Sequence, residues 1–195
     1  MDAALKQQIV QEAREYWDGG QPYQAGRTLF EHIPLESRHT WAYQLLMLAR
    51  PYFPRDPQVE AILEFTRCPQ SWGQGRPDPC DQARRIIHDV DARRSHSPIF
   101  ALAAQAGKLS YTAQRYPQPF DHDAGWKLAV PAWHIARKSC DNELAGQLWS
   151  ALANQGLLLL DLPIMCHPAC PTCAANGLTS ARAAFAPAMP QIHNT

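Results

Sequence analysis

Three cysteines and one histidine stand close together in the stretch MCHPACPTC (165–173). The thiols follow the spacing Cys166-x3-Cys170-x2-Cys173, and His167 lies beside the first of them. Thiolate and imidazole are the groups that zinc prefers in proteins, and a structural zinc site takes four ligands. The two prolines of the stretch favour a tight turn that would bring the side chains to one ion. We therefore predict a structural zinc site formed by these four residues.

Two features of the stretch keep alternatives open. His167 is adjacent to Cys166, which makes joint ligation by both awkward, and His193 could provide the fourth ligand instead. Zinc modules usually place their ligands in two separated pairs, whereas this sequence has one group. A proline-rich tail whose thiols bind no metal is therefore the main alternative to the zinc site.

Two redox interpretations of the same thiols are weaker. Cys170 and Cys173 form a C-x-x-C pair, but no βαβ pattern surrounds them as it does in thioredoxin-like proteins. The three-cysteine spacing also matches the 4Fe–4S cluster motif of radical S-adenosylmethionine enzymes. Those enzymes need a long βα barrel after the motif, and only residues 174–195 follow it here. The remaining cysteines stand singly and are expected to be core or surface thiols: Cys68, Cys80 and Cys140.

A second candidate site is the adjacent pair His88-Asp89 in ARRIIHDVDARRSH. In the all-α HD metal phosphohydrolases such a pair joins an upstream histidine and a downstream aspartate around a divalent metal, whose bound water attacks phosphate. His39 would be the upstream ligand here, and Asp121 or Asp123 the downstream one. An HD-like phosphohydrolase centred on His88 and Asp89 is therefore the alternative function.

The simpler interpretation of that segment is an exposed helix. Arg84 and Arg85 would then pair with Asp89 and Asp91 across one helical turn. The sequence has no Gly-x-Ser-x-Gly motif, no P-loop and no dinucleotide-binding glycine pattern. We therefore expect a protein without catalytic residues.

The elements that must position these residues are predicted to be helices. Apolar residues recur at helical spacing, and glycine, proline and aspartate mark the ends of the segments. Asp56 and Asp141 are predicted N-caps, Pro131 is predicted to kink its helix or split it in two, and Gly156 to end the last one. The connections are short, so the fold class is all-α with antiparallel helix pairs. The expected helices cover 3–18, 23–32, 36–50, 57–67, 80–94, 98–115, 122–138 and 142–155.

Composition fits one helical domain, over 1–160, followed by a tail rich in proline and cysteine, over 161–195. The chain has 195 residues, of which 46% are hydrophobic and 18% charged, so it can bury a core without disulfides or metal. Lys+Arg and Asp+Glu are both 18, and this neutral balance argues against a nucleic-acid partner. No apolar run reaches the ~20 residues of a membrane span, and the N-terminus lacks the pattern of a secretory signal. We therefore expect a cytoplasmic protein, without membrane insertion, that binds a protein partner.

Six tryptophans are expected mainly in the core. Trp72 lies in a segment rich in glycine and proline, so it is the best candidate for an exposed anchor at a protein interface.

The order of segments over about residues 8–160 carries a family resemblance. The segments are GGQPYQAGRTLFEHIPLESRHTWAYQLLMLAR, VEAILEF, FALAAQAGKLSY and DNELAGQLWSALANQGLLL. In this order they resemble an uncharacterised bacterial family of small helical proteins, several of which are encoded near contractile secretion machines. The resemblance implies an adaptor or accessory role, and it neither implies catalytic residues nor includes the cysteine stretch. The first two predicted helices and the turn between them also match the helix–turn–helix pattern of a tetratricopeptide unit, although no second copy occurs at a fixed period.

Overall fold

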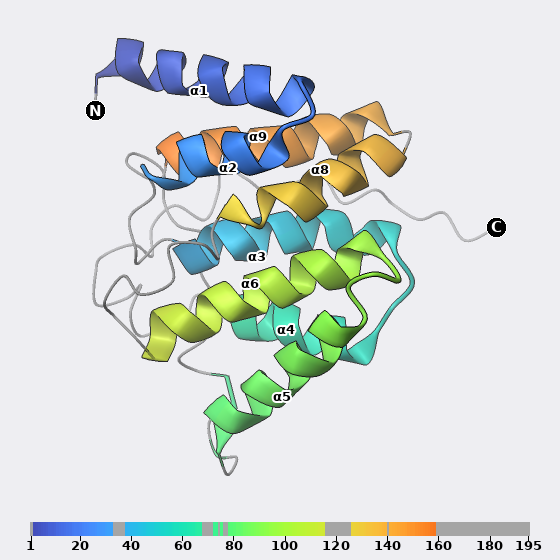
Figure 1. Ribbon diagram of the computed structural model, residues 1–195. Coiled ribbons are helices and arrows are strands. Elements are labelled where there is room, and N and C mark those ends of the chain that lie inside the picture. The colour runs from blue at the N-terminus through green and yellow to red at the C-terminus, as the bar shows by residue number, and fades with distance from the viewer. Residues whose placement is uncertain are drawn as a thin grey trace, which may run out of the picture.

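The structure of the protein, a computed structural model, describes residues 2–32, 38–67, 72–73, 75, 78–115, 126–139 and 141–158. All regular secondary structure in these ranges is helical, which confirms the predicted all-α class. The described helices follow one another as antiparallel pairs (Figure 1). The pairs are α1 (Ala3–Asp18) with α2 (Pro22–Phe30), α3 (Arg38–Ala49) with α4 (Pro57–Arg67), α5 (Pro79–Ala92) with α6 (Pro98–Arg115), and α8 (Ala129–Lys138) with α9 (Asn142–Leu158). A short 3-10 helix, η2 (Arg50–Tyr52), follows α3.

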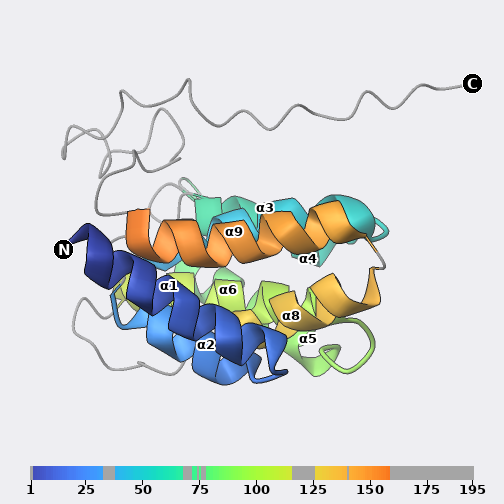
Figure 2. The same ribbon diagram turned by 90° about the horizontal axis from the view of Figure 1, so that it is seen from above.

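The pairs stack so that helices α3 and α6 lie between two outer groups. Helices α4 and α5 pack on one side of α3 and α6, and α8 and α9 pack on the other. The N-terminal pair, α1 and α2, then covers α8 and α9 (Figure 2). Helix α1 is therefore an outermost element, and its C-terminal end rests near α8 and α9.

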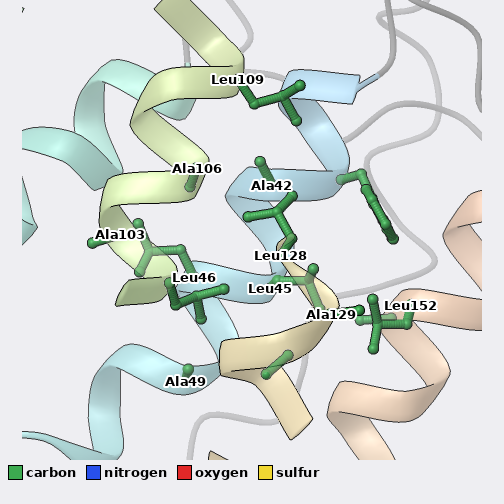
Figure 3. Packing of buried hydrophobic residues seen from close by; sticks show 14 of the residues in the cluster. Ala42, Leu45, Leu46, Ala49, Ala103, Ala106, Leu109, Leu128, Ala129 and Leu152 are labelled. Carbon is green, nitrogen blue, oxygen red and sulfur yellow. The ribbon is translucent and has the colours of Figure 1, made fainter. Parts of the chain in front are cut away.

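The core is built from small and large apolar residues that alternate between facing helices. Figure 3 shows Ala42 and Leu46 of α3 facing Ala103 and Ala106 of α6. Helix α3 is buried nearly all round, because Trp41, Ala42, Leu45, Leu46 and Ala49 are all fully buried. Helix α3 is therefore a central element of the core.

Two glycines allow close approaches between helices. A Cβ atom on Gly26 of α2 would lie 2.5 Å from the Cβ atom of Ala129 and 2.7 Å from the carbonyl oxygen of Trp126. A Cβ atom on Gly107 of α6 would lie 2.7 Å from Cγ1 of Ile87 on α5. These distances are shorter than a Cβ atom tolerates. Gly26 therefore sets the spacing between α2 and α8, and Gly107 sets the spacing between α5 and α6.

The predicted caps are confirmed, whereas the predicted helix end at Gly156 is wrong. Asp56 accepts the backbone N–H groups of the first turn of α4, and Asp141 does the same for α9. Residues 127–128 form a turn and α8 begins at Ala129, so Pro131 lies in the first helical turn, where its missing N–H costs nothing. Pro131 therefore does not kink α8, and the split is the alternative that fits, because residues 127–128 interrupt the helical conformation between Trp126 and α8. Gly156 lies inside α9, which continues to Leu158, so it does not end the helix.

Candidate functional site

The predicted zinc ligands fall in a part of the chain that the structure does not describe. Cys166, His167, Cys170 and Cys173 lie outside the described residues, as does His193. Within the ranges that the structure describes, no group of three or more histidine, cysteine, aspartate or glutamate side chains is arranged to hold a metal ion. The zinc site therefore stays a prediction.

The single cysteines are placed only in part. Cys80 is a free thiol, half-buried in the first turn of α5. Cys68 and Cys140 lie outside the described residues.

The His88–Asp89 pair lies on the outer face of α5. Its side chains are 84% and 57% exposed, and His88 Nδ1 lies 3.6 Å from Asp89 Oδ1. Asp89 also accepts a hydrogen bond from Gln58 Nε2 of α4 at 3.3 Å. Asp121, Asp123 and the side chain of His39 lie outside the described part. The ligand set of the alternative hydrolase is therefore not assembled among the described residues, and that function stays a prediction.

The predicted ion pairs along α5 are wrong in their partners. Arg84 pairs with Asp81 at 3.6 Å, one turn toward the N-terminus. Asp91 pairs with Lys108 Nζ of α6 at 2.7 Å and lies 3.8 Å from Arg94. Because α6 packs against this side of α5, its lysine reaches Asp91. Asp89 and Asp91 thus join α5 to α4 and α6, whereas the pair of Asp81 is local.

Three tryptophans from three helices meet at the C-terminal end of α1. Trp17 of α1 is buried, and its ring centroid lies 5.6 Å from that of Trp149 on α9. The indole N–H of Trp133 on α8 donates to the carbonyl oxygen of Trp17 at 2.9 Å. Gly20 follows with φ of 76°, and a Cβ atom there would lie 3.8 Å from the Trp133 ring. Trp133 and Trp149 are only half-buried, so part of each ring faces solvent.

An arginine side chain lies over the ring of each of these two half-buried tryptophans, Trp133 and Trp149. The guanidinium carbon of Arg14 lies 5.0 Å from the Trp149 ring centroid, and that of Arg137 lies 4.9 Å from the Trp133 centroid. Both are within the distance of a cation–π contact. We call Arg14, Trp133, Arg137 and Trp149 the tryptophan–arginine surface. It combines rings held in place by packing with charged groups that can donate hydrogen bonds to a partner.

Sequence reasoning missed this surface and chose another tryptophan. Trp72 is half-buried, as Trp133 and Trp149 are, and packs edge-on against Phe65 at 5.4 Å between ring centroids, so it stays a predicted anchor. The spacing of Trp133 and Arg137, four residues apart on one helix, is a local signal that could have shown half of the surface. The contact between Arg14 and Trp149 joins distant segments and has no such local signal.

A second aromatic group is buried where α2 meets α3 and α8. The Phe30 ring lies 5.9 Å from Trp41 and 5.6 Å from Trp126 between centroids. The indole N–H groups of Trp41 and Trp126 have no acceptor within the described residues. With Trp41 fully buried and Trp126 nearly so, this group belongs to the core and offers little surface to a partner.

Comparison with family models, with curated proteins and with solved structures finds no match to this chain. Among the described helices, none has both the length and the apolar character needed to cross a membrane.

Proposed function

We propose that this protein is a non-enzymatic helical module that binds a partner protein through the tryptophan–arginine surface and acts as an adaptor or accessory protein. One observation carries the proposal: Trp133 and Trp149 stay partly exposed where α1, α8 and α9 meet, and an arginine side chain lies over each ring. Tryptophan and arginine are the residue types that supply most of the binding energy at protein interfaces. The sequence resemblance to an uncharacterised family of small helical proteins, several of them encoded near contractile secretion machines, points to the same role.

The rigidity of the surface supports binding as well. Trp133 is fixed by its hydrogen bond to the Trp17 carbonyl, and Trp149 by ring contact with Trp17. Side chains that are already ordered lose little conformational entropy when a partner covers them. A preformed pair of rings therefore binds more tightly than the same residues on a flexible loop.

The zinc site predicted from Cys166, His167, Cys170 and Cys173 is part of the proposal. A bound zinc ion would order the tail that follows α9, the helix that carries Trp149. A zinc-bound turn in this tail would be a second, compact structural element that follows the helical module in the chain.

A comparative capture experiment tests the proposal. The full chain, carrying an affinity tag, is used as bait, together with the variants Trp149→Ala, Arg14→Ala and Arg84→Ala. We expect wild type and Arg84→Ala to retain the same partner, because Arg84 lies on α5 and its ion pair with Asp81 is local. Trp149→Ala should weaken binding by at least about 10-fold, which is typical of a central interface residue. Circular dichroism checks that each variant keeps its helices.

Two results would count against this function. Binding of the same partner by wild type and Trp149→Ala alike would exclude the tryptophan–arginine surface. A phosphodiesterase activity that depends on a divalent metal and is lost in His88→Ala would replace the adaptor by the alternative hydrolase. No contact among the described residues favours that alternative.

A further inference from the structure

Charges of both signs surround the tryptophan–arginine surface. On α1, Arg14 pairs with Asp18 at 2.7 Å, and Glu15 adds a second carboxylate. The junction of α8 and α9 also holds both signs, with these residues in chain order: Arg137, Lys138, Asp141 and Glu143. Charge of one sign therefore does not select the ligand of this surface. An uncharged segment that covers the rings avoids the cost of removing ionic groups from water.

The surface offers aromatic rings and hydrogen-bond donors side by side. The rings of Trp133 and Trp149 are half-buried, whereas the side chain of Arg137 is exposed and forms no ion pair with any described residue. The guanidinium carbon of Arg137 lies 4.9 Å from the centroid of the Trp133 ring. A ligand that fits this arrangement presents an apolar face to the rings and carbonyl oxygens to the guanidinium.

A proline-rich segment has that chemistry. Proline lacks a backbone N–H and fixes φ at about −65°, so the pattern Pro-x-x-Pro favours the polyproline II helix. This helix has no internal hydrogen bonds, and its carbonyl oxygens stay free to accept from a partner. Domains that recognise such segments hold them against aromatic side chains, and the preformed helix loses little entropy on binding.

Such a segment occurs in this chain, after α9. Residues 159–195 follow Leu158 and contain two Pro-x-x-Pro patterns, Pro168–Pro171 and Pro187–Pro190. The first pattern lies among the predicted zinc ligands. The second lies in APAMPQ (186–191), which we call the proline segment. No aspartate or glutamate follows Asp161, so the proline segment adds no carboxylate side chain to a surface that already holds several.

The length of chain after α9 allows the proline segment to reach the surface. Trp149 precedes Leu158 by about 14 Å along the axis of α9, at ~1.5 Å per residue. About five extended residues span that distance, and residues 159–185 precede the proline segment. Groups joined by a short linker meet at an effective concentration of millimolar order. Even a weak contact between proline and tryptophan would therefore keep the surface occupied.

We propose that the proline segment docks on the tryptophan–arginine surface of its own chain, with its prolines on the two half-buried rings and its carbonyl oxygens accepting from Arg137. This inference rests on the proposed function, because it assigns a regulator to the same docking surface. A partner protein then binds only after it displaces the segment. The segment lowers the apparent affinity for the partner, and its removal from the surface raises that affinity.

A peptide probe tests the proposal without a known partner. The probe is a fluorescently labelled peptide of residues 184–192 (AFAPAMPQI), and fluorescence anisotropy measures its binding to the full chain. The full chain is compared as wild type, as Pro187→Ala/Pro190→Ala, and as the control Pro163→Ala. Pro163 is a tail proline outside both patterns, so its replacement leaves the proline segment intact. The same peptide with both prolines changed to alanine controls for non-specific binding.

We expect the peptide to bind Pro187→Ala/Pro190→Ala at least about 10-fold more tightly than wild type, because the competing segment has lost its prolines. Pro163→Ala should match wild type. Trp149→Ala, added to the double proline variant, should weaken the peptide about 10-fold. Arg137→Gln, added in the same way, should weaken it about 3-fold through a lost donor, and this exposed residue can change without disturbing the core.

Other results would overturn the inference. Equal affinity of the peptide for wild type and the double proline variant would show that the segment does not occupy the surface of its own chain. Absence of binding to every variant, or binding that is indifferent to Trp149 and Arg137, would show that the surface does not hold proline. A wild-type dimer in light scattering that becomes a monomer in the double proline variant would place the segment on a second copy.

The capture experiment separates this inference from the proposed function. If the inference holds, Pro187→Ala/Pro190→Ala retains more partner than wild type does. A partner retained equally by both, yet lost with Trp149→Ala, would remove the regulation and leave the function in place. Retention of the partner that is indifferent to Trp149 would overturn the proposed function itself, whatever the peptide does.

Discussion

Arg93, just after α5, holds Asp56, the residue that caps α4. Arg93 Nη1 lies 2.6 Å from Asp56 Oδ2 and Nη2 lies 3.2 Å from Oδ1, while Oδ1 also accepts the N–H groups of Gln58 and Val59 at 3.0 and 3.1 Å. The guanidinium carbon lies 4.2 Å from the Phe100 ring centroid of α6. One carboxylate therefore both starts α4 and joins it to the helix pair α5–α6.

Loss of Asp56 should destabilise the protein measurably. Asp56→Ala removes the cap, which is worth about 1 kcal/mol, and leaves the half-buried guanidinium of Arg93 with Gln58 Oε1 as its remaining acceptor, so we expect a total of about 1–2 kcal/mol. Urea unfolding followed by circular dichroism measures the free energy of unfolding. Arg84→Ala is the matched control, because its exposed pair with Asp81 should contribute less than about 0.5 kcal/mol. Equal losses in the two variants would show that the Asp56–Arg93 pair contributes no more than a surface pair.

The same pair predicts a dependence on acid. The hydrogen bond from Arg93 holds the pKa of the Asp56 carboxyl below its ordinary value, although partial burial opposes this. A carboxyl with a lowered pKa in the folded state stabilises the fold above its unfolded pKa, near 4, and this stabilisation is lost as the pH falls through the folded pKa. We expect the free energy of unfolding to fall below about pH 4. The fall should be shallower in Asp56→Asn, and a series of urea titrations over pH compares the two slopes.

Tyr52 offers a test at the alkaline end. Burial raises the pKa of its hydroxyl, and the negative charges of Asp141 and Glu143 raise it further, with a hydrogen bond to Asp141. A raised pKa means that the stabilising contribution is present below the unfolded pKa, near 10, and is lost as the pH rises through the folded pKa. The difference in tyrosinate absorbance between wild type and Tyr52→Phe should give the Tyr52 titration, which Asp141→Asn shifts to lower pH. An unshifted titration in Asp141→Asn would contradict the contact.

Two glycines should respond to alanine in opposite directions. In Gly26→Ala the new Cβ atom would meet the Ala129 Cβ atom and the Trp126 carbonyl oxygen, and the backbone atom cannot rotate away. We expect a loss of about 1–3 kcal/mol from overpacking. Gly146 lies exposed inside α9, and a Cβ atom there would have no neighbour within 4 Å, so Gly146→Ala should stabilise the helix by about 0.5–1 kcal/mol. Thermal unfolding of both variants checks the sign, and a stabilised Gly26→Ala would show that α2 and α8 can separate freely.

Local signals predicted most of the helices because they act within a few residues. Asp56 and Asp141 were identified as caps from sequence, and both bind backbone N–H groups of the turn that follows them. The predicted helix end at Gly156 is wrong because packing holds α9: Leu148 and Leu152 are fully buried, and such contacts override the weak helix propensity of one glycine.

The candidate surface could be predicted only in part. The Trp133–Arg137 contact spans one helical turn and is readable from sequence. The contacts of Trp149 with Trp17 and Arg14 depend on how α1 crosses α9, which is set by the whole stack of helices. Half-burial of a tryptophan is likewise a tertiary property, which the glycine and proline around Trp72 do not encode.

Metal analysis tests the predicted zinc site in the tail. Protein purified without chelator should contain one zinc ion per chain, and Cys170→Ser or Cys173→Ser should lose it, since hydroxyl is a poor zinc ligand. Cys80→Ser is the matched control, because Cys80 is a free thiol on α5 and its loss should leave the metal in place. Comparison of His167→Ala with His193→Ala then identifies the fourth ligand by which variant binds zinc more weakly.

The helical body provides the second readout of that experiment. The described helices bury a continuous apolar core, so loss of zinc should leave the circular dichroism of the helices and the midpoint of urea unfolding nearly unchanged. Zinc loss accompanied by global unfolding would show that the tail is part of the core and not a separate zinc-bound element.

Protein without zinc would leave MCHPACPTC a tail of thiols that bind no metal, and iron with a brown colour would favour the cluster interpretation. Because the tryptophan–arginine surface is built from α1, α8 and α9 alone, partner binding that survives zinc loss would assign docking to the helices and a separate role to the tail.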